Sequence, residues 1–335
     1  MVNLAEIIKN EFSSKKIVIV GDLVADQFLR GTINRVSREA PVFILRHDET
    51  ETLGGGAANA AVNVASLGGR ACLVGLVGVD ANGELLLKKL REAGVNCDSV
   101  ISDEKIQTTT KVRVLAGQHY APRQQVIRID YENRAEIGED LKTKLKENLV
   151  SAAAGADAIV ISDYNYGAAC EEIARAARRL AKEERIPLLI DSRFRLENFS
   201  GATTATPNQE EVEQILGKDF SEKDCVKLRE KLSLDSLLIT RGNSGMLLIE
   251  KDKSPLHLEA VGSKEPVDVT GAGDTVIAAY ALGLASGLSF PESARLANHA
   301  GGIVVMKKGT AFVMRDELLA SLEKYSPAEH KTQTR

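Results

Sequence analysis

Tryptophan is absent from this 335-residue sequence, and aromatic residues make up only 4% of it. So few aromatic rings argue against a single-stranded nucleic-acid surface, where bases stack on such rings. An excess of basic residues is lacking too, because 43 Lys and Arg face 47 Asp and Glu, for a formal charge of −4. Proteins that grip nucleic-acid phosphates normally show the opposite balance. We therefore expect no nucleic-acid partner and favour a globular enzyme.

Cysteines and long hydrophobic runs are scarce as well. The four cysteines (Cys72, Cys97, Cys170 and Cys225) form no Cys-x-x-Cys pair and lie at no metal-binding spacing from histidine. They predict reduced thiols rather than disulfides or a zinc site. The longest apolar stretch, 276–288, is too short and too rich in glycine to span a bilayer, and the N-terminus does not resemble a signal peptide. The expected location is the cytoplasm, with no membrane partner.

What the sequence does contain is a regular alternation of apolar runs and amphipathic segments. The runs expected to form strands are 17–20, 71–77, 158–161, 187–190 and 236–240. The segments expected to form helices are 59–67, 84–93, 171–184 and 210–216, with two more beginning at Thr275 and Pro291. Such alternation predicts an α/β fold with three layers, in which helices cover both faces of a mostly parallel sheet. We expect one domain over 1–335.

Two segments, at about 31–53 and 107–130, break this alternation. They contain period-two stretches at 41–46, 111–115 and 125–129, which are typical of strands with one buried and one exposed face. We expect the two segments to pair into a small β-sheet that projects from the core as a lid. Two separate surface hairpins are the alternative.

The segment 268–275, Asp-Val-Thr-Gly-Ala-Gly-Asp-Thr, carries the clearest chemical signal. Two glycines around a small residue let backbone N–H groups converge at a helix start, where they favour an anion. Asp274 would repel a resident anion. Its presence makes sense if the anion is a transferring phosphoryl group and the carboxylate takes a proton from the attacking hydroxyl. An aspartate that caps a helix behind a Gly-rich turn explains the same residues equally well.

A second glycine cluster, Gly-Gly-Gly-Ala-Ala-Asn at 54–59, also opens a predicted helix. It would let the backbone approach a small polar ligand, with Asn59 hydrogen bonding to that ligand. An ordinary Gly-rich loop is the alternative. Asp22 ends the first predicted strand, where open α/β sheets bind ligands, so it is a candidate contact for sugar hydroxyls. A turn or cap aspartate is the alternative for Asp22.

Together, the two motifs resemble the two signatures of the ribokinase-like, PfkB-type carbohydrate kinases. The resemblance extends from Gly21 to about Thr310. Within that family the chain most resembles kinases of D-glycero-β-D-manno-heptose 7-phosphate. The segments that carry this closer resemblance are 21–26, 35–41, 162–164, 205–208 and 268–276.

The resemblance implies roles for the matching residues. Asp274 would be the catalytic base, and the backbone of Gly271, Ala272 and Gly273 would form the anion hole. The sugar substrate would be bound by Asp22, Gly55, Asn59, Arg35 and Asp163. ATP would be bound by Asn208, Thr240, Gly242 and Asn298, with Asn208 and Glu211 also holding Mg²⁺ through water.

Further expectations follow from the same resemblance. Asp268, Thr270 and Gly309 resemble a loop that binds a monovalent cation, which makes K⁺ a possible activator. The lid would cover the sugar and form a homodimer interface. Alternative functions are a kinase of another sugar, of a sugar phosphate or of a nucleoside, and a sugar-binding sensor without catalysis.

Two departures bear on the acceptor. Heptose kinases carry Asp-Pro-Lys-Gly where residues 191–194 read Asp-Ser-Arg-Phe, and a lysine near the position of Tyr166. Arg193 keeps one cation, but Arg and Lys are not equivalent at a phosphate site. The cationic side chains that could dock an acceptor phosphate instead are Arg35, Arg38, Lys111, Arg113 and Arg123. We predict an ATP- and Mg²⁺-dependent sugar kinase, with a heptose 7-phosphate as the leading acceptor.

Overall fold

The computed structural model describes residues 2–118, 123–132, 137–263 and 265–325, and residues 119–122 of the predicted lid lie outside this part. Its main sheet has nine strands in the order β13-β12-β11-β10-β9-β8-β1-β4-β5. Their bounds are β1 Lys16–Gly21, β4 Arg70–Gly78, β5 Asn96–Asp103, β8 Ala158–Asp163, β9 Leu188–Ser192, β10 Thr204–Ala205, β11 Ser236–Thr240, β12 Met246–Glu250 and β13 Leu256–Leu258. Neighbours from β5 to β11 are parallel, and β12 and β13 are added antiparallel.

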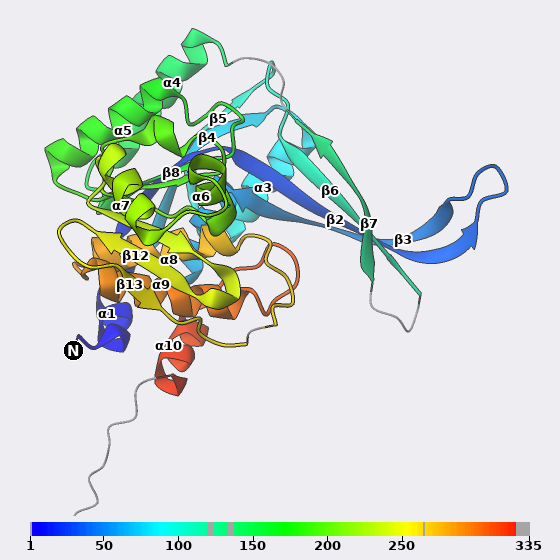
Figure 1. Ribbon diagram of the computed structural model, residues 1–335. Coiled ribbons are helices and arrows are strands. Elements are labelled where there is room, and N and C mark those ends of the chain that lie inside the picture. Colours follow the sequence, from blue (N-terminus) through cyan, green and yellow to red (C-terminus); the bar gives the residue numbers. More distant parts are fainter. Residues whose placement is uncertain (1, 119–122, 133–136, 264, 326–335) are drawn as a thin grey trace, which may run out of the picture.

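Helices pack on both faces of this sheet (Figure 1). One face carries α1 Leu4–Asn10, α2 Ala57–Ser66, α3 Ala81–Glu92, α8 Ala272–Ala285, α9 Phe290–Val304 and α10 Arg315–Lys324. The other carries α4 Glu139–Ala153, α5 Glu171–Glu184, α6 Gln209–Leu216 and α7 Glu222–Lys231. Strand β1 divides its side chains between the two cores, with Ile17 and Ile19 on one side and Val18 and Val20 on the other. Burial on both faces explains why β1 is continuously apolar in sequence.

The lid is a separate four-stranded sheet in the order β3-β2-β6-β7. Its strands are β2 Leu23–Val36, β3 Phe43–Gly56, β6 Thr110–Gly117 and β7 Gln124–Tyr131. In Figure 1 it projects from the helical body, and the hairpin of β2 and β3 reaches farthest. Strand β2 begins well before residue 31, where period two first becomes visible. Its first residues, 23–26, are all buried against the body, so they show no alternation of apolar and polar positions.

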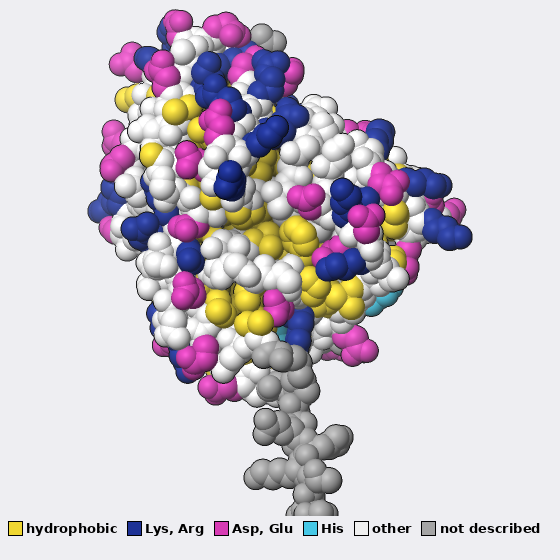
Figure 2. Space-filling view, turned by 90° about the vertical axis from the view of Figure 1, so that its left-hand side faces the viewer, with side chains coloured by type: hydrophobic (Ala, Val, Ile, Leu, Met, Phe, Trp, Pro, Cys, Tyr) yellow, Lys and Arg dark blue, Asp and Glu magenta, His cyan; other side chains and the backbone are white. Residues whose placement is uncertain are grey.

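The α/β architecture agrees with the expectation from sequence. The helices α1, α4, α7 and α10 and the strands β5, β10, β12 and β13 were not among the predicted elements. The four cysteines are free thiols. None of the described helices is both long and apolar enough to cross a membrane. On the face shown in Figure 2, Lys and Arg side chains are interspersed with Asp and Glu side chains.

The carboxyl ends of β1 and β8 meet at one edge of the sheet. Gly21 permits this close approach, since a Cβ at this position would lie 2.0 Å from the carbonyl oxygen of Ser162. The chain leaves β1 through a single residue, Asp22, and enters β2 of the lid directly. The lid therefore starts from the edge where open parallel sheets bind ligands.

Candidate active site

A cleft of about 910 Å³ separates the lid from the carboxyl edge of the main sheet. The lid contributes Val24, Asp26, Gly55, Lys111, Arg113 and Arg128 to its walls. The body contributes Tyr164, Asp191, Arg193, Asn208, Glu211, Thr240, Gly242, Asn298 and the residues from Thr270 to Asp274. The cleft thus brings together most of the predicted site residues from elements that are far apart in the sequence.

Asp274 lies in the first turn of α8 at the bottom of this cleft, with 2% of its surface exposed. The amide of Asn59 donates a hydrogen bond to its Oδ2 at 2.8 Å, and the hydroxyl of Tyr164 donates to its Oδ1 at 2.9 Å. Burial raises the pKa of Asp274 to about 7, against the lowering effect of these two donors. A carboxyl group with this pKa can accept a proton at neutral pH, as a general base must.

The turn before α8 explains its glycines. Gly271 has φ +76°, and a Cβ there would lie 2.5 Å from the amide nitrogen of Asn59. Gly271, Ala272 and Gly273 all line the cleft. The first N–H groups of an α-helix have no carbonyl acceptor inside the helix itself. The N–H of Ala272 already donates to the carbonyl oxygen of Val269 at 3.2 Å. The expected anion hole would therefore depend more on the N–H groups of the neighbouring residues in this turn.

Asn208 and Glu211 line the cleft at the start of α6, where they cap the helix reciprocally. Asn208 Oδ1 accepts the N–H of Glu211 at 2.9 Å, and Glu211 Oε2 accepts the N–H of Asn208 at 2.8 Å. This capping box explains their spacing without any ligand. Burial raises the pKa of Glu211 to about 7, and it raises the pKa of nearby Asp191 with help from the charges of Glu211 and Asp274.

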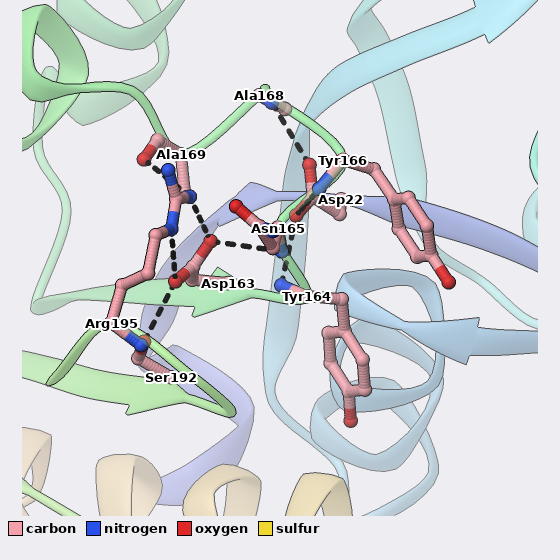
Figure 3. Close-up of polar contacts among 9 residues, drawn as sticks. All are labelled: Asp22, Asp163, Tyr164, Asn165, Tyr166, Ala168, Ala169, Ser192 and Arg195. Atoms are coloured by element: carbon pink, nitrogen blue, oxygen red, sulfur yellow. Dashed lines mark hydrogen bonds and ion pairs between the residues drawn. The ribbon is translucent and has the colours of Figure 1, made fainter. Parts of the chain in front are cut away.

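Two aspartates expected to bind the sugar have other partners (Figure 3). The Asp22 carboxylate accepts the backbone N–H groups of Tyr164 at 2.8 Å, Tyr166 at 3.0 Å and Ala168 at 2.9 Å. Asp163 forms an ion pair with Arg195 and accepts a hydrogen bond from the hydroxyl of Ser192 at 2.7 Å. Neither aspartate lines the cleft. For Asp22, this placement favours the turn alternative over a sugar contact.

The remaining predicted sugar contacts differ in their placement. Arg35 is exposed near the far end of β2 and does not line the cleft. Gly55 lines it, and a Cβ there would lie 2.6 Å from Asp26 Oδ2, so glycine leaves room for that carboxylate. The amide of Asn59 is turned toward Asp274 and acts as a donor to the candidate base.

Asp26 and Lys111 line the cleft. Lys111 was among the five cations considered for an acceptor phosphate, whereas Asp26 was not predicted as a site residue. Asp26 accepts hydrogen bonds from Arg113 at 2.5 Å and from Thr310 at 2.7 Å, and it lies opposite Lys111 in the register of β2 and β6. In the structure, Val24 and Asp26 face the cleft, whereas Ala25 between them packs in the core. Because residues 23–26 show no alternation in sequence, no local signal marked Asp26.

Lys111 is a cation with little contact to water. It is 9% exposed, burial lowers its pKa, and it makes no hydrogen bond or ion pair with a described residue. Its ammonium lies 5.9 Å and 5.6 Å from the ring centroids of Tyr164 and Tyr166. A desolvated ammonium that lines a cleft without a carboxylate partner is suited to an anionic ligand.

Three residues predicted to bind ATP also line the cleft. Thr240 ends β11, Gly242 follows with φ +54°, and Asn298 lies in α9. The Asn298 amide donates to Glu259 O at 2.7 Å. Small residues form the adjoining walls, namely Ala260, Val261, Gly301 and Gly302.

The three residues of the expected cation loop also come together. Asp268 Oδ1 accepts the N–H of Thr270 at 3.0 Å, and its Oδ2 accepts the N–H of Gly309 at 2.9 Å. These bonds lower the pKa of Asp268 against the effect of its partial burial. The loop is therefore held in shape next to the turn that leads into α8.

This arrangement can be compared with known proteins. The family model described as "pfkB family carbohydrate kinase" matches residues 14–317. The chain belongs to the PfkB family. Similar curated relatives of this PfkB protein include the "Bifunctional protein HldE" of Hahella chejuensis, 39% identical over 318 residues, and that of Haemophilus influenzae, 40% identical over 316 residues. The alignments cover 93% and 92% of this chain but only 64% and 63% of those relatives.

Solved structures show the same fold at lower identity. Arabidopsis thaliana ribokinase complexed with ribose and ATP is 22% identical with a TM-score of 0.69, covering 92% of this chain and 98% of that one. Escherichia coli phosphofructokinase-2 in complex with potassium is 20% identical with a TM-score of 0.76, covering 93% and 99%. The ribokinase-like fold expected from the sequence is confirmed.

Proposed function

We propose that this PfkB-family protein is an ATP-dependent sugar kinase and that a heptose 7-phosphate is its leading acceptor. The observation that carries the kinase reaction is Asp274. It lies at the Gly-rich start of α8, its carboxylate is held by two donors, and its pKa of about 7 suits a base. The same turn offers N–H groups for the phosphoryl group, so base and anion site lie side by side.

The chemistry follows from this geometry. A sugar hydroxyl gives its proton to Asp274 while its oxygen bonds to the γ-phosphorus of ATP. The bond from that phosphorus to the β–γ bridging oxygen breaks, and ADP leaves. The N–H groups at the start of α8 stabilise the charge on the transferred group. The lid, which forms one wall of the cleft, would keep water away from the reacting phosphorus.

Mg²⁺ is the metal that fits these residues. Burial raises the pKa of Asp191, and the charges of Glu211 and Asp274 raise it further. A nearby cation would relieve this repulsion. Within the described ranges, no group of three or more His, Cys, Asp or Glu is arranged to hold a metal alone. Asn208 and Glu211 would hold it through water, and the metal would neutralise the ATP phosphates.

The acceptor is proposed from Lys111 and its neighbours. Lys111 and Arg193 line the cleft without an ion pair to a described residue, whereas Arg128, also in the wall, is paired with Asp130. Two cations without carboxylate partners favour an acceptor that already carries a phosphate. The motifs that resemble heptose 7-phosphate kinases agree with this chemistry, as does the similarity to the bifunctional protein HldE. Another sugar, another sugar phosphate and a nucleoside are alternative acceptors.

Three further properties belong to this proposal. The loop of Asp268, Thr270 and Gly309 would bind K⁺, so the rate should rise when K⁺ replaces a bulky monovalent cation, and an equal rate would refute activation. The lid would form a homodimer interface. A cytoplasmic location agrees with the free thiols and with the need for ATP.

The test is ADP release from ATP and Mg²⁺ across a panel of sugars, sugar phosphates and nucleosides, heptose 7-phosphate included. Asp274→Asn should lose about a thousandfold or more in kcat and still bind ATP. The matched control is Asp316→Asn, which removes an exposed carboxylate from the first turn of another helix, α10, and should keep its activity. Neutral sugars outperforming sugar phosphates would overturn the proposed acceptor. Tight binding of a sugar without acceptor-dependent ADP release would favour the sensor.

A further inference from the structure

The loop 164–168 lies over two buried carboxylates that take no part in the cleft (Figure 3). Asp22, from the junction of β1 and β2, accepts three backbone N–H groups of this loop. Asp163, at the end of β8, accepts the N–H of Asn165 at 3.1 Å and is held by Arg195 and Ser192. Two aspartates therefore fix the course of one short loop.

That loop presents Tyr164 to Asp274. The backbone N–H of Tyr164 is bound to Asp22, and its hydroxyl donates to Asp274 Oδ1 at 2.9 Å. The Tyr164 side chain also lines the cleft. Asp22 is thus linked to Asp274, at the bottom of the cleft, through the single residue Tyr164. Its own carboxylate does not line the cleft.

The second donor to Asp274 is fixed from α2 in a similar way. Asn63, one turn after Asn59 and fully buried, donates to Asn59 Oδ1 at 3.2 Å. This contact turns the amide nitrogen of Asn59 toward Asp274 Oδ2. Asn63 Oδ1 in turn accepts the hydroxyl of Thr275 at 3.0 Å and the N–H of Val313 at 3.2 Å. Both oxygens of Asp274 therefore have donors whose own orientation is fixed.

We propose that Tyr164 is a positioning residue for Asp274, and that Asp22 sets its place by holding the loop 164–168. A carboxylate oxygen can accept more than one hydrogen bond, so each oxygen of Asp274 keeps a lone pair for the acceptor hydroxyl. The hydroxyl of Tyr164 fixes the carboxylate plane and stabilises its ionised form. This inference rests on the proposed function, because Asp274 is taken as the base of that reaction.

The surroundings of Asp274 determine the sign of the effect. It is faced by Asp26 from β2, which disfavours its charge, and by Lys111 from β6, which favours it. Asp191 from β9 adds a further acidic neighbour. Burial is the largest influence on the pKa of Asp274 and raises it, while the hydrogen bonds from Asn59 and Tyr164 lower it. Loss of the Tyr164 hydroxyl should therefore leave the base protonated up to a higher pH.

The experiment compares Tyr164→Phe with Tyr166→Phe by the pH dependence of kcat. Tyr166 comes from the same loop, but its hydroxyl bonds to Glu132 at 3.2 Å, away from Asp274. In Tyr164→Phe the acidic limb of the kcat profile should move upward by about one pH unit, the effect of one hydrogen bond to a charged group. In Tyr166→Phe that limb should stay where it is in the wild type. An unmoved limb in Tyr164→Phe, or equal shifts in both variants, would overturn the proposal.

A second readout separates this inference from the kinase reaction itself. Carbon-13 NMR of aspartate carboxyls, assigned with Asp274→Asn, follows the titration of Asp274 in the protein without substrates. The same upward shift is expected there for Tyr164→Phe, even if no acceptor in the panel supports turnover. Asp22→Asn, which replaces one acceptor oxygen by a donor, should shift the Asp274 titration in the same direction through Tyr164. No shift in either variant, with native circular dichroism, would refute the positioning role.

Discussion

Thr310 donates a hydrogen bond to Asp26 Oδ2 at 2.7 Å, joining residues 284 positions apart in one buried contact. Asp26 belongs to the lid strand β2, and Thr310 follows the loop that contains Gly309. Arg113 of β6 binds the other oxygen of Asp26 at 2.5 Å. The base of the lid is thereby tied to the segment that borders the start of α8, so lid and catalytic floor share one polar cluster.

Thr310→Val should reveal how much this contact contributes. The substitution keeps the shape of the side chain and removes a hydrogen bond to a buried carboxylate, which should lower the free energy of unfolding by about 1.5–3 kcal/mol. Chemical denaturation at neutral pH measures the change. Thr32→Val is the matched control, because Thr32 also donates to a carboxylate, Asp48, at 2.7 Å, but on the exposed part of the lid. Equal losses in both variants would contradict the role of burial.

Asp274 should make stability depend on pH. Its folded pKa of about 7 lies above the ordinary value of 3.8, so the folded state binds its proton more tightly than the unfolded state does. Its ionisation costs no stability below pH 3.8, and the cost grows as pH rises to about 7 and is complete above that value. Asp274→Asn removes this cost and should be more stable than the wild type at pH 8, by up to about 4 kcal/mol.

Denaturation curves of both proteins at pH 4, 6 and 8 test this prediction. The difference in unfolding free energy between Asp274→Asn and the wild type should increase across the series. Asp316→Asn, whose carboxylate is exposed, should show no comparable trend. A constant difference from pH 4 to pH 8 would mean that Asp274 ionises as easily in the folded protein as in the unfolded chain.

Lys111→Met should separate acceptor recognition from ATP binding. The substitution keeps the apolar stem and removes the ammonium near the rings of Tyr164 and Tyr166. We expect KM for a phosphorylated acceptor to rise by about tenfold to a hundredfold, the effect of losing one charge-assisted contact. KM for ATP should change little. The control is Lys88→Met, an exposed lysine of α3. A rise of the ATP KM alone would place Lys111 with the nucleotide instead.

Local sequence patterns were sufficient for much of this structure. The run 158–161 and the centre of 236–240, residues 237–239, are apolar because both faces of the sheet are covered. Asp274 could be located because a helix start rich in glycine has a local signature, and the structure indeed places it in the first turn of α8. These features depend on neighbours in the sequence.

Contacts between distant segments could not be read in this way. Asp22 and Asp26 both lie near the end of the first strand, and nothing local shows that Asp22 turns under a loop while Asp26 faces the cleft. The hydrogen bond from Tyr164 to Asp274 spans 110 residues. Only the meeting of β8 with the start of α8 brings these two side chains together.

The lid supplies the last prediction, which concerns its apolar surface. Val36 and Phe43 are partners in the register of β2 and β3, and they are 55% and 59% exposed. On β7, Ile127 and Ile129 are also exposed. Apolar side chains gathered on one small projecting sheet are typical of an interaction surface. The proposed homodimer would place a second copy of the lid on this surface, because a two-fold interface pairs the same patch with itself.

Phe43→Asp should therefore convert a dimer into a monomer. Sedimentation velocity at micromolar concentration measures the change, because an unpaired carboxylate buried in an apolar interface opposes association. Val150→Asp is the matched control, since it places the same charge on an exposed apolar residue of α4, outside the lid. The control should sediment as the wild type does. If the wild type is already monomeric, or if Phe43→Asp remains dimeric while Val150→Asp dissociates, the lid is not the interface.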